Sequence, residues 1–463
     1  MKKNSIFAVT TALFMILSMT ACSDIAETSQ KNLTNAQAAA EEKTVSAGSG
    51  EAPVTDEEEQ QTTTAATEAE KEDAPVTTTT QKTTASAVTA SYTAYENGVL
   101  DTADMFSERD LAQQADLTEA KTLEVKDGET LSISEEGVYV ITGTAKDCTI
   151  RIEADDTAKV QLVLNGVSIT NQDFPAIYVV NADKCFITTA EGSENSLSVT
   201  GSFTADGDTN TDAVIFSKQD IVLNGTGSLA INSSANGISG KDDVKFTGGT
   251  YTITSAEDAI EANDSIRICG GDFTVKTDKD GLHSENDEDN TKGYIYIAGG
   301  SFKIDAASDG IQGTTYVQID GGTFDINASE GIEATYVQIN DGTINIYATD
   351  DGINASTKST ACEICIEFNG GYTTVEVGPG DTDGIDANGK IIVNGGTIDV
   401  TGQMSTFDYD SIAEFNGGTI IVNGEEVSEI PQSMMGGPGG MRDGFPGDMG
   451  DMPDFGGGRS MNV

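Results

Sequence analysis

Apolar and polar residues alternate along most of this chain, beginning at Thr122. The segments TLEVKDGETLSISEEGVYVITGTA (122–145) and KVQLVLNGVSIT (159–170) carry apolar residues at about every second position. This is the period of a β-strand with one buried face. No segment of this region has a convincing helical period. The pattern therefore predicts an all-β protein built from many short strands.

A short Gly-rich phrase recurs from about Phe174 onward. It reads Gly299-Gly300-Ser301-Phe302 in one copy and Gly321-Gly322-Thr323-Phe324 in the next. Most copies lie about 20 to 25 residues apart, a period typical of a solenoid. Because only short turns are expected between parallel strands, the fold predicted is a right-handed parallel β-helix of about ten coils.

Each coil is expected to place one large side chain at the same inward position. Stacked one above another, these side chains would form a continuous column in the core, and each coil would cover the edge of the coil before it. The residues at this position are Tyr251, Phe273, Phe302, Phe324, Ile344, Ile398 and Ile420.

The N-terminal residues 1–22 have the pattern of an export signal. Lys2 and Lys3 precede a short apolar run that ends in Met19-Thr20-Ala21-Cys22, which resembles a bacterial lipobox. We therefore expect lipidation at Cys22 and an exported protein, anchored by lipid on the outer face of the bacterial cell membrane. A signal peptide that is simply cleaved is the alternative.

Two further segments lack the strand pattern. Residues 23–95 are rich in Thr, Ala and Glu, and residues 425–463 are rich in Gly, Met and Pro. Neither composition supplies a core, so both are predicted to be disordered, as a linker and a tail. The β-helix is assigned to residues 96–424.

The charge balance limits the partners. The 463 residues include 25 Lys and Arg but 76 Asp and Glu, which gives a formal net charge of −51. A field of this sign argues against nucleic acid and favours cations. Besides Cys22 there are five cysteines, irregularly spaced. Buried free thiols explain them better than a disulfide framework or a zinc site.

Acidic residues recur at one turn of each coil, and five of the six are followed by a glycine that we expect to permit a tight turn. A second, shorter set lies three residues further on. Two adjacent rows of oxygen ligands are suited to Ca²⁺, and solvated acidic turns are the alternative. The first set is Asp258, Asp280, Asp309, Glu330, Asp351 and Asp383; the second is Glu261, Glu333 and Asp386, with Gln312 and Asn354 between them.

A separate loop carries oxygen donors at alternate positions. These residues are Asp206, Asp208, Asn210 and Asp212. The loop lacks the glycine and the final glutamate of an EF-hand. It is a second candidate calcium site, with a solvated loop as the alternative.

The middle strand of each coil has an outward row with a different character. Tyr294, Tyr316 and Tyr336 occupy the same place in consecutive coils, so we expect an exposed ladder of rings that stacks on sugar faces. Ordinary strand propensity of tyrosine is the alternative. The candidate carbohydrate-binding residues are Lys245, Arg267, Tyr294, Tyr296, Tyr316, Gln318, Tyr336 and Gln338.

Together, the lipobox, the Thr-rich linker, the phrases GVYVITGTA and VQLVLNGVSIT, and the Asp-Gly-Ile and Gly-Gly-Thr coils resemble a family of bacterial cell-surface proteins. These are the carbohydrate-binding domain-containing proteins, formerly a domain of unknown function. The resemblance spans about 123–424. It implies a calcium-binding parallel β-helix, similar in fold to pectate lyases, that binds cellulose and polygalacturonate.

We therefore expect a monomeric, calcium-loaded protein that binds acidic pectic polymer, cellulose or both without catalysis. A calcium-dependent lyase is one alternative, although no basic residue among Lys245, Arg267, Lys279 and Lys303 is distinguished as its catalytic base. A surface scaffold or adhesin for protein partners is the other.

Overall fold

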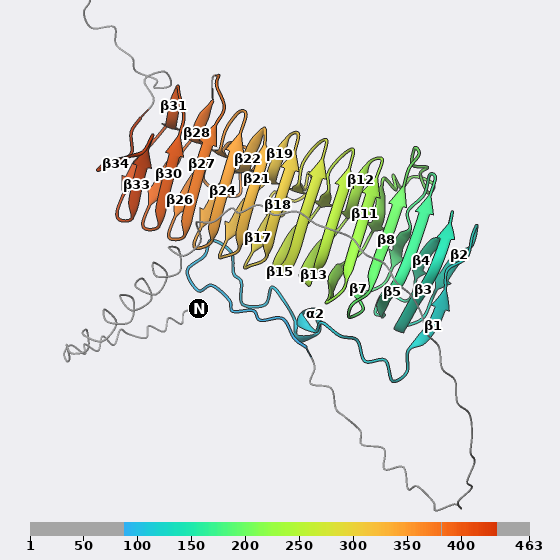
Figure 1. Cartoon of the computed structure of the whole chain (residues 1–463). Helices are drawn as coiled ribbons and strands as arrows, with labels where there is room; N and C mark the ends of the chain where they lie inside the picture. Colours follow the sequence, from blue (N-terminus) through green and yellow to red (C-terminus); the bar gives the residue numbers. More distant parts are fainter. Residues whose placement is uncertain (1–87, 381, 433–463) are drawn as a thin grey trace, which may run out of the picture. The chain divides into compact units, whose positions relative to one another are not determined.

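The computed structural model describes residues 88–380 and 382–432. Cys22, the lipobox, most of the predicted linker and most of the predicted tail lie outside the described residues. The described part is a parallel β-helix (Figure 1), as the sequence predicted. Its only described helix is the single turn α2 (Glu108–Leu111), and no described helix is long and apolar enough to cross a membrane.

One sheet contains twelve parallel strands, one for each coil, where the sequence indicated about ten. Its register places every second residue of each strand on the outer surface. The strands are β2 (Thr130–Ile133), β4 (Thr149–Glu153), β6 (Ile177–Asn181), β9 (Ala213–Ser217), β12 (Asn236–Gly240), β14 (Ile260–Ala262), β16 (Leu282–Ser284), β19 (Asp309–Gly313), β22 (Glu330–Ala334), β25 (Ile353–Ala355), β28 (Asp383–Ala387) and β31 (Ser405–Tyr409).

A second sheet of 22 strands bends, so that it provides two faces of each coil. Four long strands run through both parts of it: β3 (Gly137–Lys146), β5 (Lys159–Asn171), β13 (Asp243–Ser255) and β15 (Ser265–Thr277). The strands of its middle part alone are β1 (Lys121–Glu124), β7 (Lys184–Thr189), β10 (Ile221–Gly225), β17 (Tyr294–Ile297), β20 (Tyr316–Ile319), β23 (Tyr336–Ile339), β26 (Cys365–Phe368), β29 (Lys390–Val393) and β32 (Ala413–Phe415).

The remaining strands form the third face. They are β8 (Glu194–Val199), β11 (Ser228–Ser233), β18 (Ser301–Ala306), β21 (Thr323–Ala328), β24 (Thr343–Ala348), β27 (Tyr372–Val377), β30 (Thr397–Thr401), β33 (Thr419–Val422) and the short antiparallel β34 (Glu425–Val427). The bend between the two parts uses glycines with positive φ, such as Gly300 at +123° and Gly322 at +115°, a conformation that other residues rarely adopt.

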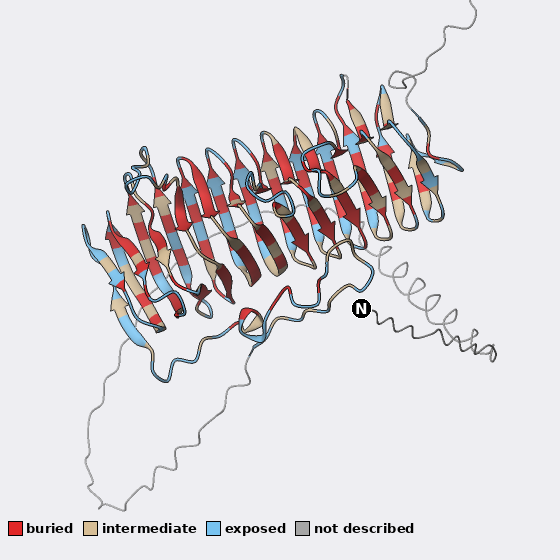
Figure 2. Ribbon diagram, turned by 180° about the vertical axis from the view of Figure 1, so that it is seen from behind, coloured by how far each residue is buried: buried red, intermediate tan, exposed pale blue. Residues whose placement is uncertain are grey.

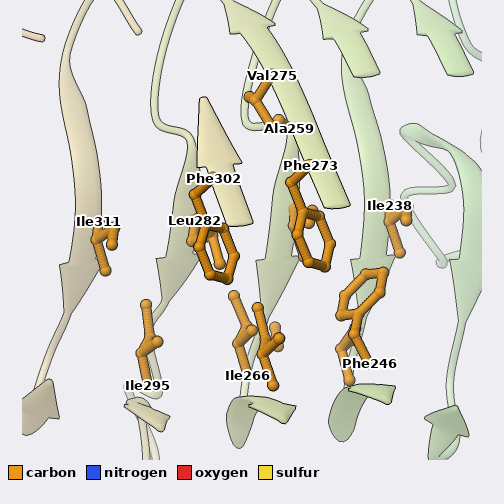
Figure 3. Packing of buried hydrophobic residues seen from close by; sticks show 14 of the residues in the cluster. Ile238, Phe246, Ala259, Ile266, Phe273, Val275, Leu282, Ile295, Phe302 and Ile311 are labelled. Carbon is orange, nitrogen blue, oxygen red and sulfur yellow. The ribbon is translucent and has the colours of Figure 1, made fainter. Parts of the chain in front are cut away.

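The predicted inward column is confirmed. The rings of Phe273, Phe302 and Phe324 stack nearly parallel, with centroids 4.8 and 4.7 Å apart, and Figure 3 shows the first two from neighbouring coils. All seven predicted members are at most 3% exposed. Thr373 takes the place between Ile344 and Ile398.

The cysteines agree with the expectation of free thiols. Cys148, Cys185 and Cys365 are buried, and Cys269 and Cys362 are half-buried. None of these five forms a disulfide, so hydrophobic packing and the strand ladder hold the described coils together.

Residues 88–113 run along the middle strands as a long loop, which we call the strap (Figures 1 and 2). Its two ends are joined by backbone hydrogen bonds, from Ala90 to Leu111 and from Gln113 to Val88, both at 2.8 Å. Residues 88–95, which the sequence pattern assigned to the linker, are therefore part of the folded domain in the structure.

Candidate functional site

The first acidic column lies where the chain enters the twelve-stranded sheet. Asp309 and Glu330 are paired in register on neighbouring coils, so their backbones are about one strand spacing, about 4.8 Å, apart. Like charges at that distance repel by roughly 1 kcal/mol even in water. Asp258, Asp280 and Asp309 are buried, whereas Glu330, Asp351 and Asp383 are half-buried.

The glycine that follows five of these six acids is required by close packing. Gly281, Gly310, Gly331, Gly352 and Gly384 do not have positive φ, so the expectation that they permit a tight turn is corrected. A Cβ on Gly310 would lie 2.5 Å from Ile326 Cγ2 and 2.6 Å from the carbonyl oxygen of Gly331. The next coil leaves no room for a side chain at this position.

The second column projects outward from the same sheet, in register across successive coils. Its position in the coil of β16 is occupied by His283, which sequence reasoning missed. The aligned phrases Asp280-Gly281-Leu282-His283 and Asp309-Gly310-Ile311-Gln312 carry the signal that could have found it. The column reads Glu261, His283, Gln312, Glu333, Asn354 and Asp386.

The charge of the first column is neutralised at Asp258. Its carboxylate accepts hydrogen bonds from Lys279 Nζ at 2.8 Å and pairs with His283 Nδ1 at 3.0 Å. Burial raises the pKa of Asp258, but the two hydrogen-bonded partners outweigh it and hold that pKa below its ordinary value. This part of the column already has cations of its own.

Asp309, Glu330 and Glu333 form a cluster of carboxylate oxygens, which we call the central acidic cluster. Ligand oxygens of these three residues lie within 4.8 Å of one another. Burial, followed by repulsion from the neighbouring carboxylates, raises the pKa of Asp309 to about 8 and that of Glu330 to about 7. Lys358 neutralises Glu333 at 2.6 Å, so a proton or a bound cation would stabilise the other two carboxyl groups near neutral pH.

An amide oxygen beside this cluster has no partner. Asn354 donates through Nδ2 to Glu330 Oε2 at 3.0 Å, while its Oδ1 is buried and accepts no hydrogen bond from the described residues. Leaving such an oxygen unsatisfied is costly. Carboxylate and amide oxygens are the ligand types that Ca²⁺ uses, so this arrangement fits the predicted cation.

Two acids further along the columns have no ion pair with a described basic side chain. They are Asp351 and Asp386, both half-buried. Burial raises the pKa of Asp351 to about 6 and that of Asp386 to about 7, with neighbouring carboxylates adding to the effect. Carboxyl groups without a described basic partner therefore extend along both columns beyond the central acidic cluster.

The alternate-donor loop is not assembled as one cation site. Asp206 accepts from the Tyr178 hydroxyl at 3.1 Å and pairs with Arg151 at 3.4 Å, while Asp208 and Asn210 are exposed. The Asp212 carboxylate accepts from Asn210 Nδ2 at 2.5 Å, and its carbonyl oxygen accepts from the Asn236 N–H at 2.9 Å. Calcium at this loop stays a prediction from the spacing of its donors.

A third carboxylate cluster was also missed. Asp242, Asp243 and Asp264 bring ligand oxygens within 4.8 Å of one another. Asp242 and Asp264 line a polar pocket of about 560 Å³ with Lys292. Arg267 pairs with Asp243 at 2.8 Å and Lys292 pairs with Asp264, so side-chain cations already offset much of its charge. The signal was an acid at the same place in two consecutive coils.

The strap covers the face that was expected to be an exposed sugar platform. Lys245, Tyr296, Gln318 and Gln338 are buried, at 6%, 0%, 0% and 2% exposure. Their expected exposure was wrong, because a distant segment without strand period packs on them.

Specific contacts fix the strap there. The N–H of Leu100 donates to Gln318 Oε1 at 2.9 Å. Phe106 and Tyr92 pack their rings against Tyr296, with centroids 6.4 and 6.5 Å apart.

The other candidates on that face are half-buried. The Arg267 guanidinium lies 5.4 Å from the centroid of the Tyr294 ring, and the rings of Tyr316 and Tyr336 are tilted at 41°, with centroids 6.1 Å apart. The ladder is therefore irregular rather than a flat stack.

Most of the β-helix matches a family of known proteins. A family model described as carbohydrate-binding domain-containing protein matches residues 127–384 and 330–427, which together cover more than half of the chain. The chain belongs to this family. A carbohydrate-binding domain-containing protein from Acetivibrio thermocellus is 46% identical over 176 residues, which are 37% of this chain and 62% of the relative.

The chain also resembles a solved structure. That structure is described as the polysaccharide lyase-like protein from C. thermocellum, gadolinium derivative. It is 30% identical, with a TM-score of 0.42, and the match covers 45% of this chain and 90% of that chain. The family assignment rests on the family model.

Proposed function

We propose that this protein is an exported surface lipoprotein that binds plant-type polysaccharide through calcium held on its acidic columns. The observation that carries the proposal is the central acidic cluster, in which three carboxylates converge beside an unpartnered amide oxygen. The family supplies the class of ligand. Calcium supplies a positive centre on an acidic protein, and its affinity for oxygen can join protein carboxylates to a uronate.

Asp309, Glu330 and Glu333 would hold the ion with Asn354, and the half-buried position of Glu330 leaves one side open toward the solvent. Ca²⁺ accepts six to eight oxygen ligands, more than these side chains provide. The remaining positions are available to the carboxylate and hydroxyls of an acidic sugar. Without the ion, this protein of net charge −51 would repel such a polymer.

A basic patch is the competing route to acidic polymer. It would require Lys245 and Arg267 to face the ligand, but Lys245 is buried beneath the strap and Arg267 is paired with Asp243 at 2.8 Å. Burial also lowers the pKa of Lys245. Bridging by calcium therefore agrees better with the positions of these groups.

A glycan array probed with the protein in calcium and in chelator tests the proposal. We expect uronate-containing glycans to be bound in calcium and lost in chelator. Calcium-independent binding that salt abolishes would favour the basic patch instead. Absence of binding to every glycan would favour the alternative of a surface scaffold for protein partners.

A further inference from the structure

Two aromatic side chains are exposed in the described part of the chain, and both lie on the third face of the β-helix. They are Tyr347 on β24 and Tyr372 on β27, at 41% and 44% exposure. Every other described tyrosine or phenylalanine is buried or half-buried. A single exposed ring needs no explanation, but two on adjacent strands of one face indicate a stacking surface.

The strand register fixes how the two rings are related. Tyr372 pairs with Thr343, and Tyr347 lies four residues further along the same strand as Thr343, opposite Glu376. With a rise of about 3.3 Å per residue and a strand spacing of about 4.8 Å, the two backbone positions are about 14 Å apart. A ligand that contacts both rings must therefore be extended and must cross the strands diagonally.

The surface between the rings is suited to hydroxyl-bearing ligands. Asn345 and Thr374 are paired in register at its centre, where Asn345 is exposed and Thr374 half-buried. Amides, hydroxyls and the Glu376 carboxylate can each hydrogen-bond to sugar hydroxyls. We call the outward side chains of β18, β21, β24, β27 and β30 the open face.

The charges of the open face argue against an acidic ligand. Its lysine Lys303 pairs with Asp325 at 3.7 Å, and Lys276 on the adjoining strand β15 pairs with Asp305 at 3.4 Å. Near the rings, Glu376 and Asp399 have no described basic partner. A uronate placed there would be repelled, whereas a neutral sugar can donate hydroxyl hydrogen bonds to both carboxylates.

We propose that the open face binds an extended neutral polysaccharide by stacking sugar rings on Tyr347 and Tyr372, independently of calcium. The inference deepens the proposed function, from which it takes only the class of ligand. It locates neutral-polymer binding on a different sheet from the central acidic cluster. It also replaces the tyrosine ladder of the middle strands, which the strap covers in part.

The test is a pull-down of the full chain on insoluble cellulose, in chelator. Tyr347→Ala combined with Tyr372→Ala is expected to weaken binding by about tenfold or more, because aromatic anchors dominate such contacts. Tyr347→Phe with Tyr372→Phe should retain most of it, because the stacking rings remain. Both rings are exposed, so melting temperatures should not change. Binding of the same variants to polygalacturonate in calcium should match wild type, which separates this inference from the proposed function.

Tyr316→Ala with Tyr336→Ala is the matched control, because it removes two half-buried rings from the middle strands. Full cellulose binding by Tyr347→Ala with Tyr372→Ala would overturn the inference. So would an absence of cellulose binding by the wild type, or a loss of cellulose binding confined to the Tyr316 and Tyr336 variant.

Discussion

Gln338 and Val99 are joined across 239 positions of sequence, the Val99 N–H donating to Gln338 Oε1 at 2.9 Å. This bond and its neighbour at Gln318 hold the turn of the strap on the middle strands. The residues that the repeat marked as an outward amide row are thereby used inside the domain. The strap is a structural part of the β-helix rather than the end of a linker.

Removing the Gln338 amide should therefore destabilise the fold. Gln338→Ala leaves the Val99 N–H without its acceptor under the strap, which should lower the free energy of unfolding by about 1–3 kcal/mol. Urea unfolding measures the change. Asn345→Ala, which removes an exposed amide from β24, is the control and should stay within about 0.5 kcal/mol of wild type. Equal effects in the two variants would contradict the assigned role of the strap.

The aromatic column gives a larger effect. Phe324 is fully buried between the stacked ring of Phe302 and the side chain of Ile344, so Phe324→Ala should cost about 3–5 kcal/mol through lost burial and a cavity. Asp325→Ala, at the adjacent outward position, removes only an ion pair with Lys303 in which both side chains are about 70% exposed. It should have little effect. Equilibrium unfolding in urea compares the two.

The raised pKa values predict how stability depends on pH without metal. Asp309 and Glu330 hold protons in the folded state up to about pH 8 and pH 7, whereas in the unfolded chain they ionise near pH 4. The folded state therefore binds more protons between these limits. Its stability should be highest at the acid end and should fall as the pH rises through the folded pKa values.

Asp309→Asn tests that assignment, because it removes one of the titrating carboxyl groups. In chelator, the variant should lose less stability than wild type between about pH 5 and pH 8.5, measured by urea unfolding. Calcium should stabilise the wild type most at the upper pH, where the protons have left. An unchanged pH slope in the variant would show that Asp309 does not titrate in this range.

Lipidation at Cys22 remains a prediction from the lipobox. Cys22→Ser should release the protein from the membrane fraction, because one lipidated residue is the proposed anchor. Immunoblotting of washed membranes and of the soluble fraction measures this. A variant that stays with the membranes after washing would contradict the lipoprotein assignment.

The sequence was sufficient for the β-helix because strand period and coil period are local signals. The inward position of Phe302 and Phe324 repeats with each coil, so their stacking could be predicted. The acidic columns followed for the same reason. The strap could not be predicted, since Val99 and Phe106 lie in a segment without period and their partners are far away in sequence.

Other parts of the candidate site could not be predicted from the sequence alone. Asp212 was grouped with Asp206 by spacing, but Asp206 bonds to Tyr178, whereas Asp212 bonds to Asn210. His283 was overlooked because a histidine interrupts an otherwise acidic and amide row. Tyr296 and Tyr347 occupy outward positions that look equivalent in the sequence. Only the path of the strap determines that the Tyr296 ring is buried and the Tyr347 ring is exposed.

The most direct measurement is polygalacturonate binding by Asp309→Asn with Glu330→Gln at several calcium concentrations. These changes remove two carboxylates from the central acidic cluster while preserving side-chain size. Asp272→Asn with Asp325→Asn removes the same charge from exposed positions on the third face and is the control. The account predicts calcium-dependent binding by wild type and the control, and a shift of at least about tenfold to higher calcium, or a loss of binding, in the cluster variant. Wild-type binding by the cluster variant at every calcium concentration would contradict it.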